Sequence, residues 1–260
     1  MTELKITVLA ENTSRCGFPT EHGLSLYVET GKKRFLFDTG QTALFAENAD
    51  RLGIDLNRVD FAVLSHGHYD HGGGIRKFLE LNDHAPVYVN VRAFEPHYNG
   101  TEKYIGLDPG LKDSERIVFT EDAYEISDEF RLSTCNSCKK AVDFGSFGLN
   151  MLQDSLPVPD DFAHEQYLLV KEGDQKILFS GCSHKGIINI VEWFRPDVLI
   201  GGFHFSKLPA DETLAGYARR LDSYNTVYYT CHCTGELQYS YMKKYMKNLH
   251  YISTGDTIEI

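Results

Sequence analysis

The sequence predicts an α/β protein in which two sheets pack face to face and helices cover their outer sides. Three observations support this prediction. Short apolar or alternating runs typical of strands occur in both halves of the chain, helical patterns follow several of them, and no low-complexity linker separates the halves. We therefore expect one domain over residues 1–260, with lid-like insertions near residues 93–113 and 135–163.

The first half of the chain contains strand patterns at residues 5–9, 24–29, 34–38, 61–64 and 86–89. Thr30, Gly31 and Lys32 supply a turn between the second and third of these strands. Apolar residues at helical spacing predict helices over residues 41–52 and 75–81.

The second half repeats this mixture of strands and helices. Strands are expected at residues 167–170, 176–180, 198–200 and 226–230, with a final pair near residues 251 and 257–260. Helices are expected over residues 186–195 and 211–223 and through residues 241–246. Residues 135–161 have a loop-like composition.

Composition excludes several classes of function. The chain carries 37 acidic and 26 basic residues, a net charge of −11, so it lacks the basic surface that nucleic acid requires. No apolar stretch approaches the roughly 20 residues of a membrane span, and the N-terminus does not resemble a signal peptide. Six cysteines in a chain of this length do not indicate a disulfide scaffold. We expect a cytoplasmic protein that acts on a small molecule, without a nucleic-acid or membrane partner; composition does not indicate an oligomeric state.

The strongest chemical signal is a group of four metal-competent side chains, His66, His68, Asp70 and His71, directly after the strand at residues 61–64. Side chains two residues apart in an extended segment point the same way, so His66 and His68 can hold one ion. After the chain turns, Asp70 and His71 project toward a neighbouring position for a second ion. Neutral imidazole and carboxylate suit zinc, iron or manganese. The alternatives are a polar loop without metal or a single structural zinc, although structural zinc sites more often use paired thiolates.

The pattern His-x-His-x-Asp-His after a strand resembles the signature of the metallo-β-lactamase fold, whose members hydrolyse lactams, thioesters and phosphodiesters. The stretches at residues 21–25, 37–41, 65–71, 180–184, 201–204 and 231–235 are similar to one branch of that superfamily. The branch is named after 7,8-dihydropterin-6-methyl-4-(β-D-ribofuranosyl)aminobenzene-5'-phosphate synthase, an enzyme of methanopterin biosynthesis. The resemblance covers nearly the whole chain and implies an αββα sandwich.

The resemblance also implies two divalent metal ions, with zinc favoured and manganese or iron as alternatives. His164, just before a hairpin, would complete the ligands of the first ion, and His232 would be the last ligand of the second. Asp38 would support residues 66–71, the metal loop, without binding metal; the alternative is an aspartate that only forms a turn. The full set of expected ligands is His66, His68, Asp70, His71, His164, Cys182 and His232.

Cys182 and His184 are both placed to approach this site. We favour Cys182 as the ligand and His184 as a contact either to substrate or to one of the ligands, and leave the reverse open. A small buried cysteine at a strand end is the alternative for Cys182. His204 reaches the same edge and could contact an anion or a leaving group, or could be a polar residue in a turn. Aspartate is the usual bridging residue of the hydrolases, so Cys182 is a departure from the family pattern.

One further histidine and four further cysteines are not expected to bind metal. His97 lies in the stretch at residues 93–113, and we expect a surface or lid residue. Cys135 and Cys138 have the spacing of zinc ligands but lack a second pair, which favours reduced loop thiols. Cys231 and Cys233 flank the last ligand and would point away from it in an extended segment.

These residues predict a metal-dependent hydrolase that acts on a small anionic, phosphorylated substrate. Metal ions would lower the pKa of a bound water toward neutrality and stabilise developing charge. Asp70 would hold the nucleophile, while His184 or His204 would steady an anion or protonate a leaving group.

Two alternatives remain open. The branch resemblance implies a transferase that joins an aminobenzoate to a phosphoribosyl compound with loss of carboxylate and diphosphate. A metal-binding sensor or redox protein on the same fold is the other alternative, because cysteine replaces aspartate at Cys182 and five further cysteines are present, namely Cys16, Cys135, Cys138, Cys231 and Cys233.

Overall fold

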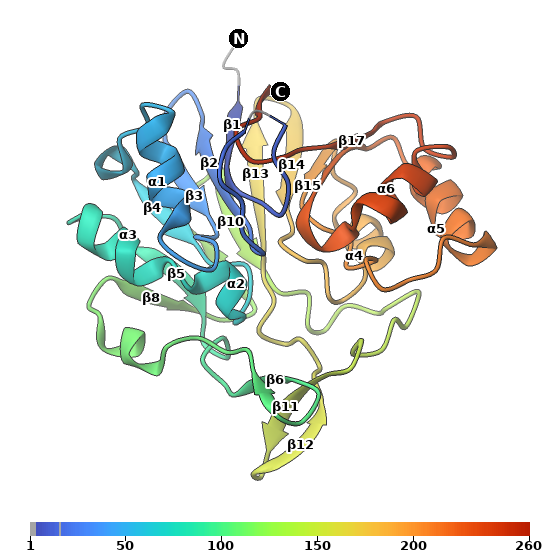
Figure 1. The fold of residues 1–260 in the computed structure, drawn as a ribbon, viewed down its shortest axis with the longest axis horizontal. Helices are drawn as coiled ribbons and strands as arrows, with labels where there is room; N and C mark the ends of the chain where they lie inside the picture. The colour runs from blue at the N-terminus through green and yellow to red at the C-terminus, as the bar shows by residue number, and fades with distance from the viewer. Residues whose placement is uncertain (1–3, 16) are drawn as a thin grey trace.

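The computed structural model describes residues 4–15 and 17–260, and within them the strands form two large sheets and one small sheet (Figure 1). Cys16 lies outside the described residues. The first large sheet has the order β18-β1-β2-β3-β4-β5-β8. Its strands are β1 (Lys5–Ala10), β2 (Ser25–Glu29), β3 (Arg34–Phe37), β4 (Phe61–Val63), β5 (Val87–Asn90), β8 (Ile117–Thr120) and β18 (Thr257–Glu259).

The second large sheet has the order β17-β16-β15-β14-β13-β10-β9. Both large sheets combine antiparallel hairpins with a parallel half, in which β3, β4, β5 and β8 run together in one and β14 to β17 in the other. The strands of the second sheet are β9 (Ala123–Glu125), β10 (Phe130–Ser133), β13 (Tyr167–Glu172), β14 (Gln175–Phe179), β15 (Val198–Ile200), β16 (Val227–Thr230) and β17 (Leu249–Tyr251).

Helices cover the outer face of each large sheet, so the layers run helix, sheet, sheet, helix (Figure 1). Helices α1 (Leu44–Arg51) and α3 (Ile75–Leu81) pack on the first sheet. Helices α4 (Ile187–Phe194), α5 (Glu212–Asp222) and α6 (Glu236–Met242) pack on the second. Within the described residues, no helix is long and apolar enough to cross a bilayer. The αββα arrangement predicted from the sequence is confirmed.

The space between the sheets is filled by inward-facing aliphatic and aromatic side chains. Phe35 of β3 stacks on Phe61 of β4 at 5.1 Å between ring centroids and meets Phe130 and Phe179 of the other sheet edge-on at 5.7 and 5.5 Å. Edge-to-face pairs of this kind contribute about 0.5–1.5 kcal/mol each beyond the burial of their area. These contacts join the two halves of the chain into one core.

The first predicted helix begins later than expected, at Leu44 rather than at residue 41. The carboxylate of Glu21 accepts the backbone N–H groups of Gln41 and Thr42 at 2.8 and 3.2 Å. These two residues are therefore held in a turn by a partner that is twenty positions away, which the helical pattern alone does not reveal.

The stretches expected to be insertions pair with each other. Strands β6 (His97–Asn99) and β7 (Lys103–Tyr104) join β11 (Leu149–Gln153) and β12 (Leu156–Pro159) in a small sheet of order β12-β11-β6-β7, at the bottom of Figure 1. The prediction of a loop over residues 135–161 is wrong where the chain forms β11 and β12. Their apolar residues alternate over so few positions, next to Pro157 and Pro159, that the loop signals outweighed the strand pattern.

Candidate metal centre

The polar side chains collect where the large sheets present the carboxyl ends of their parallel strands. Strands β4, β14, β15 and β16 all end at this edge, and the segments that follow them begin there, which is where α/β proteins place their sites. The segment after β4 carries the metal loop and turns into the short helix α2 (Tyr69–Gly72).

Glycines allow the metal loop to pack closely on its neighbours. A Cβ on Gly67 would lie 2.1 Å from the backbone oxygen of Ala93, and one on Gly73 would lie 2.1 Å from the backbone oxygen of Gln41. Neither distance is physically possible, so only glycine fits at these positions. The loop is thereby fixed between two other segments of the chain.

One group of candidate ligands consists of His66, His68 and His184. One nitrogen of each ring lies within 4.8 Å of the others, and the Nε2 atoms of His66 and His184 are 3.2 Å apart. All three rings are buried, and burial lowers the pKa of each well below its ordinary value. The rings are therefore neutral at neutral pH, which is the form that binds metal.

A second group consists of Asp70, His71, Cys182 and His232. Asp70 Oδ2 lies 3.4 Å from His232 Nε2 and 4.0 Å from His71 Nε2, and Cys182 Sγ lies 3.2 Å from His71 Nε2. Cys182 and His71 also lie within 4.8 Å of a ring nitrogen of His66. The two groups are therefore adjacent, and Cys182 stands between them.

Charge distribution differs between the two groups. Burial alone would lower the pKa of His71, but the carboxylates of Asp38 and Asp70 raise it to about 9. Burial would raise the pKa of Asp70, but His71 and hydrogen bonds from His22 and His232 hold it well below its usual range. The second group therefore carries an ionised carboxylate and would give up a proton from His71 on binding a metal ion.

Asp38 is linked to both groups, to the first through Ser65 and His66 and to the second through His71. Its Oδ1 accepts the backbone N–H of Ser65 at 2.7 Å, and its Oδ2 accepts the hydroxyl of Ser65 and Nδ1 of His71, each at 2.7 Å. Because Nδ1 of His71 donates its proton to Asp38, Nε2 is left facing Cys182. Asp38 therefore holds both Ser65 and the ring of His71, and its role as a support of a metal-binding loop stays a prediction.

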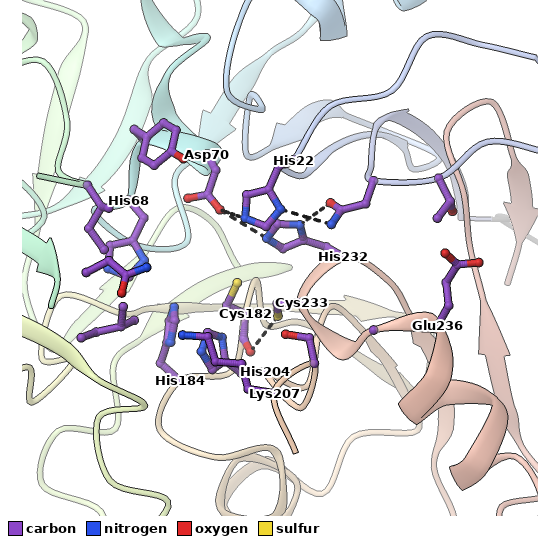
Figure 2. A pocket seen from close by; sticks show the side chains of 18 of the residues that line it. His22, His68, Asp70, Cys182, His184, His204, Lys207, His232, Cys233 and Glu236 are labelled. Carbon is purple, nitrogen blue, oxygen red and sulfur yellow. Dashed lines mark hydrogen bonds and ion pairs between the residues drawn. The ribbon is translucent and has the colours of Figure 1, made fainter. Parts of the chain in front are cut away.

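Sequence reasoning missed Asn12 and His22. Asn12 Oδ1 lies 2.7 Å from His232 Nδ1, while Asn12 Nδ2 lies 3.2 Å from His22 Nδ1. His22 Nε2 in turn lies 3.3 Å from Asp70 Oδ2 (Figure 2). His22 belongs to the matched stretch at residues 21–25, so its place in the branch pattern was the available signal, whereas the loop around Asn12 showed none.

His204 and Cys233 reach the same cavity (Figure 2). His204 lies against His184 with 4.3 Å between ring centroids. The expectation that Cys233 points away is wrong, because Cys233 lines the cavity. Its sulfur, the sulfur of Cys182 and one ring nitrogen of His232 all lie within 4.8 Å of one another. The segment His232–Thr234 forms a one-turn 3-10 helix rather than an extended strand, which turns Cys233 inward.

Cys231 and the pair in the long loop behave differently. Cys231 points away from the site into the core between the sheets, as expected. Cys135 and Cys138 are half-buried free thiols.

His164 is buried beside the metal loop, but it lies farther from His66 than His184 does. The ring centroids of His66 and His164 are 6.0 Å apart, against 4.8 Å for His66 and His184. Burial, together with the charge of His97, lowers the pKa of His164 to about 4. His97 itself is fully buried against His164, at 3.9 Å between ring centroids, so it is not a surface residue, and the expectation of a lid residue stays a prediction. Its strand β6 lies in the small sheet, and His97 O accepts the backbone N–H of Ile105, whose own carbonyl accepts the backbone N–H of Tyr69 in the metal loop.

A cavity of about 440 Å³ opens over both groups of candidate ligands. Lys103 of the small sheet and Lys207 after β15 lie on its wall, and Tyr69 and Tyr251 add aromatic surface. The cavity therefore combines candidate metal ligands with cationic groups that suit an anionic molecule.

Comparisons with known proteins agree with this architecture. The family model described as the metallo-beta-lactamase superfamily matches residues 19–224. An uncharacterized protein of Methanocaldococcus jannaschii is 31% identical over 88% of this chain and 90% of its own length. A 7,8-dihydropterin-6-methyl-4-(beta-D-ribofuranosyl)-aminobenzene-5'-phosphate synthase of the same organism is 28% identical over 98% of this chain and 96% of its own.

Among solved structures, that of Tm1679, described as a metal-dependent hydrolase of the beta-lactamase superfamily, superimposes with a TM-score of 0.82 at 29% identity. The superposition covers 99% of both chains.

Proposed function

The chain belongs to the metallo-beta-lactamase superfamily, and from this premise we propose that it is a metal-dependent hydrolase of small anionic, phosphorylated substrates. The observation that carries the proposal is the pair of adjacent ligand groups beneath one cavity with two lysines on its wall. A buried, purely structural metal would need neither the cavity nor the lysines.

Two ions are proposed, each with its own ligands. His66, His68 and His184 offer three neutral nitrogens and leave a coordination position for water or substrate. Asp70, His71, Cys182 and His232 offer a carboxylate, two nitrogens and a thiol, a set that suits zinc or iron better than magnesium. His164 is the competing candidate for the first ion, as the resemblance implies, and the metal contents of His184→Ala and His164→Ala distinguish the two.

When bound, divalent ions would supply hydroxide from water near neutral pH and stabilise the charge on the oxygen under attack. The protein's own side chains perform the remaining tasks. Asp70 orients the nucleophile, and Lys103 and Lys207 attract an anionic substrate to the cavity. His204, which lines the cavity beside His184, is placed to steady a leaving group.

The similarity to the synthase of M. jannaschii favours one alternative, a transferase that builds a related ribofuranosyl aminobenzene phosphate. Both proposals use an anionic, phosphorylated substrate and the same candidate ligands. They differ in the group that attacks the substrate, which is water in a hydrolase and an aromatic acceptor in a transferase.

The first experiment measures metal content by elemental analysis of protein purified without chelators. Wild type should contain about two zinc, manganese or iron ions per chain. His184→Ala should lose one ion, and Cys182→Ala should weaken the other. His84→Ala is the matched control, because His84 is an exposed histidine beside Asp83 that does not line the cavity.

Turnover is then assayed with a nitrophenyl phosphodiester and with phosphoribosyl diphosphate. Metal-dependent release of nitrophenol supports the hydrolase, and diphosphate release that requires an aminobenzoate supports the transferase. A protein with one iron or none, and no turnover of either substrate, would overturn both and favour a sensor or redox protein.

A further inference from the structure

A buried polar cluster lies behind the metal loop, outside the ligand groups proposed above. It consists of His97 on β6, Asp160 after β12, and His164 in the following loop. One ligand atom of each lies within 4.8 Å of the others and of a nitrogen of His68. All four side chains are buried, and among the described residues the Nε2 atoms of His68, His97 and His164 have no hydrogen-bond partner.

The hydrogen bond between Gly67 and His164 decides the chemical role of this ring. The backbone N–H of Gly67 donates to Nδ1 of His164 at 2.9 Å, so Nδ1 carries the lone pair. A neutral imidazole then carries its proton on Nε2. That atom lies 3.5 Å from Oδ2 of Asp160, and the same oxygen accepts Nδ1–H of His97 at 2.8 Å.

A hydrogen bond accepted at Nδ1 is not the arrangement of a histidine that binds metal through Nε2. A ring that accepts from Gly67 at Nδ1 could bind an ion at Nε2 only as an imidazolate, because a neutral ring has one lone pair in its plane. Metal-binding histidines instead donate the proton of their other nitrogen to a carboxylate or a carbonyl group. His164 therefore fits a role behind the metal loop better than a place in it.

We propose that Asp160, with His97 and His164, forms a positioning unit that fixes the metal loop at Gly67 and orients His68 from its buried side. Asp160 anchors the unit, because its Oδ1 accepts the backbone N–H of Phe162 at 2.7 Å. His164 holds the loop at the residue between the two ligands His66 and His68. This positioning role rests on the proposed function, because it presupposes a metal ion held by His66 and His68.

The unit also links the small sheet to the metal centre. His97 belongs to β6, which pairs with β11, and its bond to Asp160 crosses to the segment that follows β12. Displacement of the small sheet would therefore disturb His164 and, through Gly67, the spacing of the ligands. We expect metal affinity to depend on residues that never touch the ion, as is common for the partners of metal-binding histidines.

The test measures zinc affinity by competition with a chromophoric chelator, and the absorption spectrum of the cobalt-substituted protein. His164→Ala and Asp160→Asn should weaken the binding of one ion about 10- to 100-fold and shift the cobalt spectrum, with wild-type stoichiometry at saturating metal. His164→Asn should recover part of the affinity, because its Oδ1 can still accept from Gly67. His84→Ala should match wild type in every measurement.

Each outcome separates this inference from the proposed function. Loss of a full metal equivalent at saturation in His164→Ala would make His164 a ligand and overturn the positioning role. Wild-type affinity and spectrum in both His164→Ala and Asp160→Asn would overturn it as well. If His164→Ala does not fold, the nearly isosteric Asp160→Asn carries the test alone. Absence of metal from wild type would refute the proposed function itself.

Discussion

Asp38→Asn is the substitution whose effect the structure predicts most directly. The two side chains are nearly the same size, so the change removes a charge without leaving a cavity. The amide can still accept the backbone N–H of Ser65, but an NH₂ group replaces the oxygen that accepts the Ser65 hydroxyl and Nδ1 of His71. His71, buried and without its main carboxylate partner, should no longer hold its proton at neutral pH.

The magnitude follows from the pKa of His71. In the metal-free protein this pKa is raised from 6.5 to about 9, and a shift of one pKa unit corresponds to about 1.4 kcal/mol. The carboxylates thus stabilise the protonated fold by up to about 3 kcal/mol, with Asp70 contributing part of it. Measured losses of about 3–5 kcal/mol on breaking buried ion pairs are of the same size.

The sign sets the pH dependence. A raised folded-state pKa gives stability that is fully present below pH 6.5 and is lost as the pH rises through about 9. Urea unfolding of chelator-treated wild type and Asp38→Asn should therefore differ by about 2–3 kcal/mol at pH 6.5 and by much less at pH 10. A difference that stays constant over this range would refute the assignment of the effect to the His71–Asp38 pair.

Three further predictions concern the loop, a helix end and the metal centre. Gly67→Ala places a Cβ 2.1 Å from the Ala93 oxygen, so it should lower stability by about 1–3 kcal/mol or more and reduce metal content. Gly216→Ala, in open space on α5, should instead raise stability by about 0.5–1 kcal/mol. Equal melting temperatures of the two variants would contradict this prediction. Asp211→Ala removes the side chain that accepts the N–H groups of Thr213 and Leu214 at the start of α5, and thermal unfolding should show a loss of about 1 kcal/mol. Zinc uptake by the chelator-treated protein should release protons from His71 and from the Cys182 thiol, so calorimetry should find an affinity that rises with pH; Cys182→Ala isolates the His71 proton, and an affinity of this variant that stays constant as the pH rises to about 9 would argue against His71 as a ligand.

The layers of the fold were predictable because strand and helix patterns depend on neighbours in the sequence. Phe35 and Phe61 are apolar positions in short buried runs, and such runs occupy the space between the sheets in the structure. Helix ends were less predictable, since Glu21 holds Gln41 and Thr42 in a turn from a distant part of the chain. The small sheet was missed because its strands are short and rich in turn residues.

The sequence by itself determined the metal loop, because the spacing of His66, His68, Asp70 and His71 lies within one strand end and one turn. Only the tertiary structure placed His184 against His66, across 118 positions, and turned Nδ1 of His164 to Gly67. It also buried His97 and brought Cys233 to the cavity. Local spacing determines which side chains share a short segment. The distances between ligands from different segments, and the orientations of their rings, depend instead on how the ends of separate strands are placed relative to one another.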